Sequence, residues 1–394
     1  MNGSFKQVKE HQTEQEEDIC TMAFNLTNAQ QMALDFVYQQ ATQNKRQDTE
    51  RIQKILTFYE IGCSIADLVN AICDVSHLTI NFHPDRLLTE GRSVIAALYE
   101  EGIYRSQFET KISNGGLTAF AGGDRDKWEE TMLGGAYQAP GVTEAERPKY
   151  GGLNLMNYSD GACPRFGSCH FRLKQHVLRR ATLVFGDSVS DPQDRGLLNA
   201  FEPVLAGLLE EIKTHGNALG RQEVDVTTFV SALLDAGNTR ERFFHRSQGR
   251  ALDHYIEAQI HGDLRMADDI DALVADPSFQ NTATGELLAV TAKKYGFPLE
   301  WHEGFELPLE EVPSDFRGPE MPALAQRVLE NHAPENGYLD AATIGLAAVS
   351  VVANPEQWQD WGSPEDTLQH IKYLWHILVV YGKSKPLPDY QKSV

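Results

Sequence analysis

Three polar side chains of catalytic type recur at every second residue near position 260. Glu257, Gln259 and His261 alternate there with apolar residues. A period of two is typical of a β-strand, whose neighbouring side chains point to opposite faces of the sheet. The pattern predicts a strand with an apolar face and a polar face, which a solvated strand would also show. A Glu held there beside a bound sugar could stabilise positive charge developing on a sugar carbon.

A second polar cluster follows an expected strand at residues 78–82. Asn81 and His83 fall on the same face of that strand, and Arg86 comes just past its end. A guanidinium matches the geometry of a phosphate and can pair with it through two parallel hydrogen bonds. The cluster therefore favours an anion site, although an ordinary strand end with a surface Arg would give the same pattern.

Paired glycines punctuate the next segment, with polar residues between them. Ser113 and Asn114 precede one pair, and a second pair at 122–123 precedes a charged run that contains Trp128. Such a loop can offer backbone N–H groups to anionic oxygen, and Trp128 could cover an aromatic ring of a ligand. The spacing matches neither the P-loop nor the dinucleotide-binding glycine fingerprint.

Metal binding and acyl-transfer chemistry are both disfavoured by spacing. A zinc site would need Cys163, Cys169, His170 and His176, but their order fits no usual ligand pattern. Strand alternation would also point Cys169 and His170 in opposite directions. Ser188 lacks the strand–turn–helix elbow that exposes the nucleophile of serine hydrolases. We expect no metal in the site.

The elements that must position these residues form an α+β protein with a mixed or antiparallel sheet and flanking helical segments. We predict a disordered tail over 1–26, an N-terminal helical segment over 27–75, an α+β catalytic core over 76–310 and a C-terminal helical segment over 320–385. The strands expected in the core are 78–82, 152–156, 168–174, 181–185, 255–261 and 272–275. Ser64 and Asp67 resemble a capping box. The helical flanks could bind a target, but we favour a role in covering the core.

The charge balance restricts the partners. The formal net charge is −21, which disfavours sequence-independent binding to nucleic acid and docking on anionic lipid. A local run of basic residues, Arg165, Arg172, Lys174, Arg179 and Arg180, suits a phosphate-bearing small ligand better than a polymer. The five cysteines match no disulfide framework, and no apolar leader precedes residue 20. We expect a cytoplasmic protein with no membrane partner, with export by a non-classical route left open.

Residues of about 78–305 resemble a bacterial domain family of unknown function. The resemblance rests on Asn81-Phe-His-Pro-Asp-Arg86, Ser113-Asn-Gly-Gly116, Gly122-Gly-Asp-Arg125 with Trp128-Glu129, Tyr150-Gly-Gly-Leu-Asn-Leu155, Arg165-Phe-Gly-Ser-Cys-His170, Phe185-Gly-Asp-Ser188 and Glu257-Ala-Gln-Ile-His-Gly262. These motifs cover over half of the chain, and the family implies no activity.

The order of the motifs also resembles, more distantly, that of the ADP-ribosyltransferase superfamily. Those enzymes have a His or Arg on the first strand, a Tyr or Ser on a middle strand and a Glu on a late strand. The likeness implies a core of that type, with His83 or Arg86 in the first role, Tyr150 or Ser168 in the second and Glu257 in the third.

Many arginine-modifying members of that superfamily carry Glu-x-Glu, with the second Glu catalytic. Here the second position is Gln259, so the resemblance implies Glu257 as the catalytic carboxylate and Gln259 as its helper. It also implies NAD as cofactor, held by His83, Arg86, Ser113, Asn114, Tyr150, Ser168 and Trp128.

The activity implied by that resemblance is NAD-dependent transfer of ADP-ribose to a protein or small acceptor, as in an effector or toxin. Two alternatives stay open. One is an NAD glycohydrolase or other glycosidic hydrolase, with Asp253 or Glu109 as a second acid beside Glu257. The other is a nucleotide-binding regulatory module without catalysis, which the Glu-x-Gln order would suit.

Overall fold

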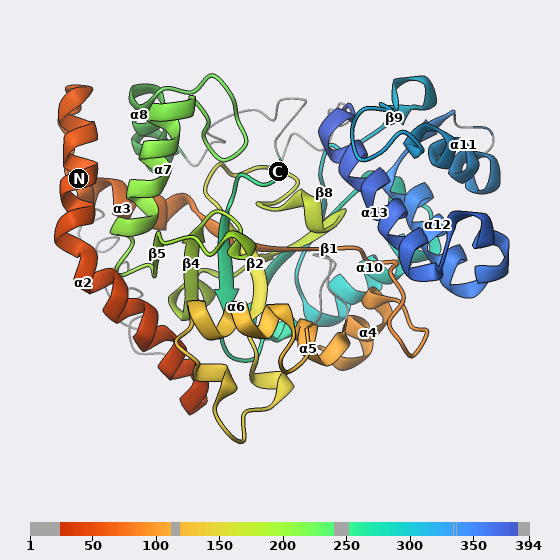
Figure 1. The fold of residues 1–394 in the computed structure, drawn as a ribbon, viewed down its shortest axis with the longest axis horizontal. Helices are drawn as coiled ribbons and strands as arrows, with labels where there is room; N and C mark the ends of the chain where they lie inside the picture. Colours follow the sequence, from red (N-terminus) through yellow and green to blue (C-terminus); the bar gives the residue numbers. More distant parts are fainter. Residues whose placement is uncertain (1–23, 112–118, 240–251, 334, 336, 385–394) are drawn as a thin grey trace, which may run out of the picture.

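The core of the protein is one sheet with helices at its two ends (Figure 1). The computed structural model describes residues 24–111, 119–239, 252–333, 335 and 337–384. The expected tail over 1–26 therefore lies almost wholly outside the described residues. Within them, no helix combines the length and the apolar character that a membrane crossing needs.

Eight strands form the sheet in the order β5-β4-β6-β2-β1-β3-β7-β8. They are β1 (His77–Phe82), β2 (Lys149–Asn154), β3 (Cys169–Leu173), β4 (Ala181–Phe185), β5 (Arg195–Gly196), β6 (Ile256–Ile260), β7 (Ile270–Ala275) and β8 (Leu299–Trp301). Every neighbouring pair is antiparallel except β7 and β8, which are parallel. The fold is thus α+β with a mixed sheet, as the sequence predicts.

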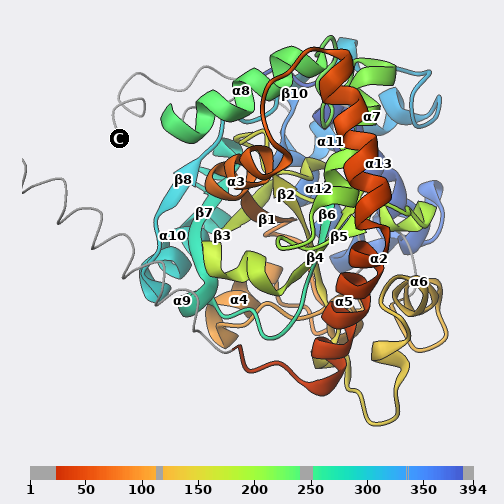
Figure 2. The ribbon, with the colours of Figure 1, turned by 90° about the vertical axis from the view of Figure 1, so that its left-hand side faces the viewer.

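The N-terminal helices cover the β5 end of the sheet. Helix α2 (Asn28–Phe58) begins at a capping box formed by Thr27 and Gln30, and α3 (Ile65–Val75) begins at the capping box of Ser64 and Asp67. Figure 2 shows α2 beside α7 (Glu202–His215), and α8 (Val226–Thr239) packs on α3. Leucine and isoleucine side chains on these helices share the main hydrophobic core with the sheet.

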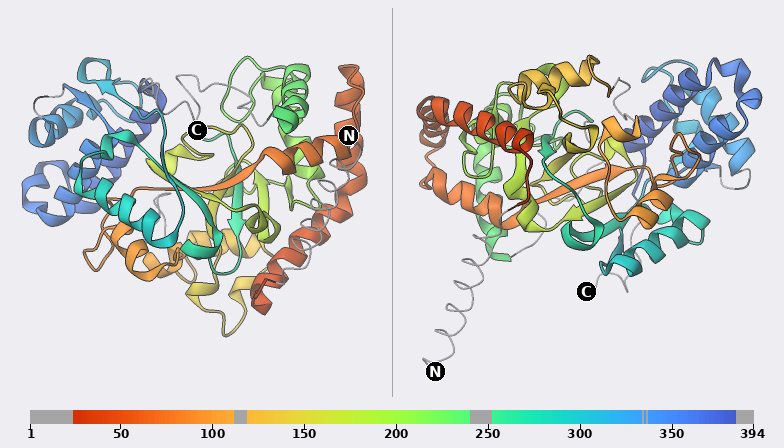
Figure 3. Two further views of the ribbon diagram at one scale, coloured as in Figure 1. Left: turned by 180° about the vertical axis from the view of Figure 1, so that it is seen from behind. Right: turned by 90° about the horizontal axis from the view of Figure 1, so that it is seen from below.

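The C-terminal helices lie at the opposite end of the molecule from α2 (Figure 3). They are α11 (Met321–His332), α12 (Ala341–Ala353) and α13 (Pro364–Tyr381), and a small sheet of β9 (Leu307–Pro308) and β10 (Tyr338–Leu339) lies beside them. On α13, the buried Trp375 donates a hydrogen bond to the carbonyl of Pro164 at 2.9 Å and packs edge-on against His83 at 5.1 Å. This helical segment packs directly on the α+β core.

Shorter helices complete the walls around the sheet. They are α4 (Val94–Glu101), α5 (Gln107–Thr110), α6 (Asp124–Met132), α9 (Met266–Asp269) and α10 (Ala283–Tyr295). Helices α4, α5 and α6 lie along one edge of the molecule in Figure 1.

Strand β6 has the apolar face and the polar face that the sequence predicts, but the polar face is closed to solvent. All five residues of β6 are buried, and Glu257, Gln259 and His261 are exposed by only 6%, 0% and 0%. The face is closed because η1 (Ala136–Gln138) covers it, with the Tyr137 hydroxyl 2.6 Å from His261 Nδ1. A solvated strand face is thereby excluded. Strand β7, which follows β6 in sequence, is separated from it in the sheet by the three strands β2, β1 and β3.

Candidate functional site

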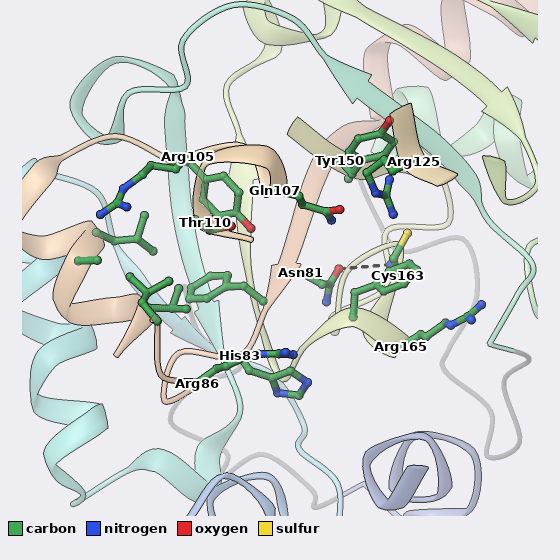
Figure 4. Close-up of a pocket in the computed structure, with 18 of the residues that line it drawn as sticks. Asn81, His83, Arg86, Arg105, Gln107, Thr110, Arg125, Tyr150, Cys163 and Arg165 are labelled. Atoms are coloured by element: carbon green, nitrogen blue, oxygen red, sulfur yellow. Dashed lines mark hydrogen bonds between the residues drawn. The ribbon is translucent and has the colours of Figure 1, made fainter. Parts of the chain in front are cut away.

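A pocket opens where β1, β2 and β6 lie side by side. Its wall includes His83 and Arg86 just beyond β1, Tyr150 on β2 and Glu257 on β6. The pocket is open to solvent, and its empty volume, including the solvent space at its mouth, is about 1210 Å³. Figure 4 shows His83, Arg86 and Arg165 toward one end and Tyr150 with Arg125 toward the other. The three adjacent strands bring together residues that are up to 174 positions apart in sequence, from 83 to 257.

The paired glycines of β2 permit this close arrangement. Gly152 lies directly opposite Glu257 in the β2–β6 register. A Cβ atom on Gly152 would lie 2.6 Å from Cys163 Sγ, and one on Gly151 would lie 2.4 Å from the Thr79 carbonyl. Side chains at these positions would push the loop before η3 (Pro164–Phe166) and strand β1 away from β2.

Glu257 is a buried carboxylate with incomplete hydrogen bonding. Its Oε1 accepts from Gln259 Nε2 at 2.8 Å, and its Oε2 accepts from the Ser188 hydroxyl at 3.2 Å and backbone N–H at 3.4 Å. Burial and the nearby negative charge of Asp187 raise the pKa of Glu257 to about 7, against the opposing charge of Arg125. The long contacts leave Oε2 able to accept a stronger hydrogen bond from a ligand.

A chain of buried hydrogen bonds fixes the orientation of Gln259. The Thr182 hydroxyl donates to Gln259 Oε1 at 2.8 Å and lies 3.2 Å from His261 Nε2, while Tyr137 contacts His261 Nδ1. Because Thr182 has one proton, His261 Nε2 must carry the N–H that points at Thr182, and Tyr137 must donate to Nδ1. Every donor then points toward Glu257. Burial, aided by the charges of Lys149 and Arg180, lowers the pKa of His261 to about 3, consistent with the neutral ring that this chain requires.

Tyr150 faces the pocket, but its hydroxyl is already engaged. It donates to Glu129 Oε1 at 2.9 Å, and the Arg125 guanidinium lies over its ring at 4.4 Å. Arg147 donates to Glu129 Oε2 at 2.7 Å. Burial nevertheless raises the pKa of Glu129, which is fully buried, to about 7. The Tyr150 ring therefore forms part of the pocket wall, and its hydrogen bond to Glu129 fixes its position.

Three pocket residues were not identified as site residues from the sequence. Arg125 is exposed by 7%, and its Nε has no hydrogen-bond partner among the described residues. Asp187 accepts from the Tyr255 hydroxyl at 2.7 Å, and Arg165 lies 3.5 Å from Asp187 and also pairs with Asp253. The sequence does contain a signal for the helix that positions Arg125, because acidic residues directly after Gly122-Gly123 are typical of the first turn of a helix.

The basic run over 165–180 does not form one patch. Arg172 pairs with Asp271 and Glu300, and Arg180 pairs with Asp269. Of the five residues in that run, only Arg165 lines the pocket. The others are separated because the run passes through β3 and the turn after it.

The His83 end of the pocket is positively charged. Burial, with the charges of Arg86 and Lys372, lowers the pKa of His83 to about 3, so its ring is neutral near pH 7. Burial also lowers the pKa of the Arg86 guanidinium below its usual range. A neutral imidazole and two guanidiniums, Arg86 and Arg165, present hydrogen-bond donors suited to phosphate oxygens.

Several predicted site residues lie elsewhere. Ser168 is buried at the start of β3 and does not line the pocket, and Trp128 lies behind Arg125, whose guanidinium is 5.7 Å from the Trp ring. Asp253 and Glu109 also fall outside the pocket wall, so neither is placed to act as the second acid. Gln259 supports Glu257 from behind. Ser113 and Asn114 lie outside the described residues.

The described part of the chain contains no group of three or more His, Cys, Asp or Glu side chains arranged to hold a metal ion. Of the four residues that a zinc site would need, Cys163 and Cys169 are free, buried thiols. His176 instead pairs with Asp269 at 2.9 Å.

Residues 77–381 match a protein family of unknown function, DUF3626, and the chain belongs to this family. The matched region runs from the start of β1 to the end of α13 and so includes the whole pocket. None of the curated proteins compared with this chain matches it.

Proposed function

We propose that the protein binds NAD in this pocket, breaks the bond between nicotinamide and ribose, and transfers ADP-ribose to a protein or small acceptor. The observation that carries the proposal is the meeting of Glu257, Tyr150 and the His83–Arg86 turn on one wall. These are the late-strand, middle-strand and first-strand positions that the resemblance to ADP-ribosyltransferases implies.

The cations at the His83 end suit the pyrophosphate of NAD. Arg86 and Arg165 lie there together, and a phosphate accepts charge-assisted hydrogen bonds from guanidinium groups in a fixed geometry. Each such bond contributes on the order of 1.5–3 kcal/mol. With the pyrophosphate at this end, the nicotinamide ribose would extend along β2 toward Glu257, and the Tyr150 ring would form the wall beside it.

Glu257 supplies the chemistry that the bond cleavage requires. As the glycosidic bond breaks, its electron pair moves to the nicotinamide nitrogen and cancels the positive charge there, while positive charge develops on the ribose. The Glu257 carboxylate would accept a hydrogen bond from a ribose hydroxyl and stabilise that charge in a buried, low-dielectric site. The acceptor then attacks the sugar carbon and releases its proton to solvent or to Glu257.

The decisive experiment follows nicotinamide release from NAD by the purified full chain, with and without a cell lysate that contains acceptors. Glu257→Gln keeps the shape of the side chain and its contact with Gln259, so NAD binding should persist while release falls about a hundredfold or more. Glu130→Gln, an exposed neighbour on α6, is the matched control and should release nicotinamide at the normal rate.

The outcomes separate the possible activities. Lysate-dependent labelling of protein would establish transfer, and release without labelling would identify water or a small molecule as the acceptor. Near-full release by Glu257→Gln would refute the role of Glu257. NAD binding with no release under either condition would leave a binding module.

A further inference from the structure

A cluster of basic side chains continues from the pocket onto helix α13. The α13 basic cluster consists of Arg86, Arg165, Arg317, Lys372 and His376. Arg86 and Arg165 line the His83 end of the pocket, and Lys372 and His376 are four residues apart on α13 and therefore share one face of that helix. Trp375, between them in sequence, packs against His83 and holds α13 at this end of the pocket.

The electrostatic environment of the cluster is dominated by positive charge. Burial, together with the charges of Arg165, Arg86 and Arg317, lowers the pKa of Lys372 to about 8. Burial lowers the pKa of His376 to about 2, and the charges that reinforce this effect are again positive, with Arg317 and Arg165 foremost. Arg165 is compensated by Asp187 and Asp253, but Lys372 and Arg317 form no ion pair within the described residues, so an anion bound between these two would compensate their charges.

Unsatisfied donors in the cluster point to the same conclusion. His376 is exposed by only 1%, and neither of its ring nitrogens has a hydrogen-bond partner among the described residues. The buried Nε atoms of Arg317 and Arg165 are likewise without a partner in that part of the chain. Buried polar groups in folded proteins are almost always paired. Oxygen atoms of a bound ligand could accept hydrogen bonds from the N–H groups among these nitrogens.

We propose that the α13 basic cluster is a second anion subsite that takes a phosphate monoester next to the pyrophosphate end of the pocket. This inference deepens the proposed function and rests on it for the identity of the ligand beside the subsite. The monoester could belong to the dinucleotide itself, as the 2′-phosphate of NADP, or to a phosphorylated acceptor. In both cases Lys372, Arg317 and neutral His376 would donate hydrogen bonds to its oxygens.

The test measures binding to the full chain by calorimetry, so that it does not depend on turnover. The probes are NAD, NADP, and inorganic phosphate added to protein already saturated with NAD. Lys372→Gln removes a charge from the cluster and keeps a side chain of similar length. Lys54→Gln, an exposed lysine on α2, is the matched control. Arg317→Gln provides a second variant in case Lys372→Gln folds poorly.

If the dinucleotide carries the monoester, NADP should bind at least about tenfold more tightly than NAD, and Lys372→Gln and Arg317→Gln should remove that difference without weakening NAD. If the acceptor carries it, NADP and NAD should bind equally, and inorganic phosphate should bind to the NAD-saturated protein but not to either variant. Equal binding of all probes by the wild type and both variants would overturn the subsite. If the wild type binds no NAD but binds inorganic phosphate added without NAD, and both variants do not, the proposed function alone is overturned.

Discussion

Two glutamates, Glu129 on α6 and Glu257 on β6, are buried near Arg125. Burial raises the pKa of each to about 7. Their partners differ. Glu129 accepts short hydrogen bonds from a guanidinium at 2.7 Å and a phenol at 2.9 Å, whereas Glu257 accepts one short bond from a neutral amide and two long contacts from Ser188.

The difference separates a carboxylate that is satisfied within the fold from one that a ligand in the pocket could reach. Both oxygens of Glu129 are satisfied, so its negative charge is compensated within the fold. Glu257 lines the pocket and keeps unused acceptor capacity, which is costly in the free protein and useful only when a ligand supplies donors. Arg125, near both carboxylates, couples the two environments because its charge acts on each of them.

The largest effect is expected from truncating Glu129. Glu129→Ala would leave Arg147 without its buried partner and Tyr150 without an acceptor, so the free energy of unfolding should fall by about 3–5 kcal/mol. Urea unfolding followed by circular dichroism measures the change. Glu130→Ala, at the next position but exposed, should alter stability by less than about 0.5 kcal/mol. Equal effects of the two variants would show that Glu129 is not a structural carboxylate.

Glu257→Gln should have the opposite effect on stability. The folded protein holds a proton on Glu257 up to about pH 7, whereas the unfolded chain loses it near pH 4.5, so this group makes the wild type less stable as the pH rises between those values. Relative to the wild type, the variant should gain roughly 3 kcal/mol of unfolding free energy between about pH 5 and pH 8. If the difference in unfolding free energy between the wild type and the variant does not change with pH, the pKa of Glu257 is not raised.

The pH dependence of turnover tests whether the ionisation of Glu257 controls the proposed activity. If the charged form of Glu257 stabilises the ribose cation, kcat/KM for NAD should rise about tenfold per unit of pH up to about pH 7 and then level off. Glu129, which also has a pKa of about 7, is kept away from the substrate by Tyr150. A rate that instead falls as the pH rises through 7 would assign Glu257 the role of a proton donor.

Local sequence patterns predicted most of the individual elements. Strand β4 occupies 181–185 and helix α13 occupies 364–381 as expected, because alternation and helical spacing are properties of a few neighbouring residues. The order of the strands was not accessible in this way. It depends on pairings such as that of Gly152 with Glu257, which only the folded sheet creates.

The same reason explains which parts of the site were predicted. Glu257, Tyr150, His83 and Arg86 lie on or just beyond strands, where period and motif order placed them correctly in one pocket. Trp128 was a wrong expectation, because residues 124–132 form a helix that turns Arg125 toward the pocket instead. The interpretation of the flanks as cover agrees with the packing of Trp375 on α13 against the carbonyl of Pro164.

The smallest expected effect concerns the support behind Glu257. Thr182→Val removes one hydroxyl from a buried position and leaves Gln259 Oε1 without its donor, so stability should fall by about 1–3 kcal/mol. Gln259 is then free to turn its amide away from Glu257, and nicotinamide release should fall about tenfold with little change in the affinity for NAD. Thr182→Ser keeps the hydroxyl and should restore most of the rate, which a purely packing role for Thr182 would not allow. If Thr182→Val releases nicotinamide as fast as the wild type, then Gln259 does not position the carboxylate, and the contrast between Glu257 and Glu129 reduces to their exposure to the pocket.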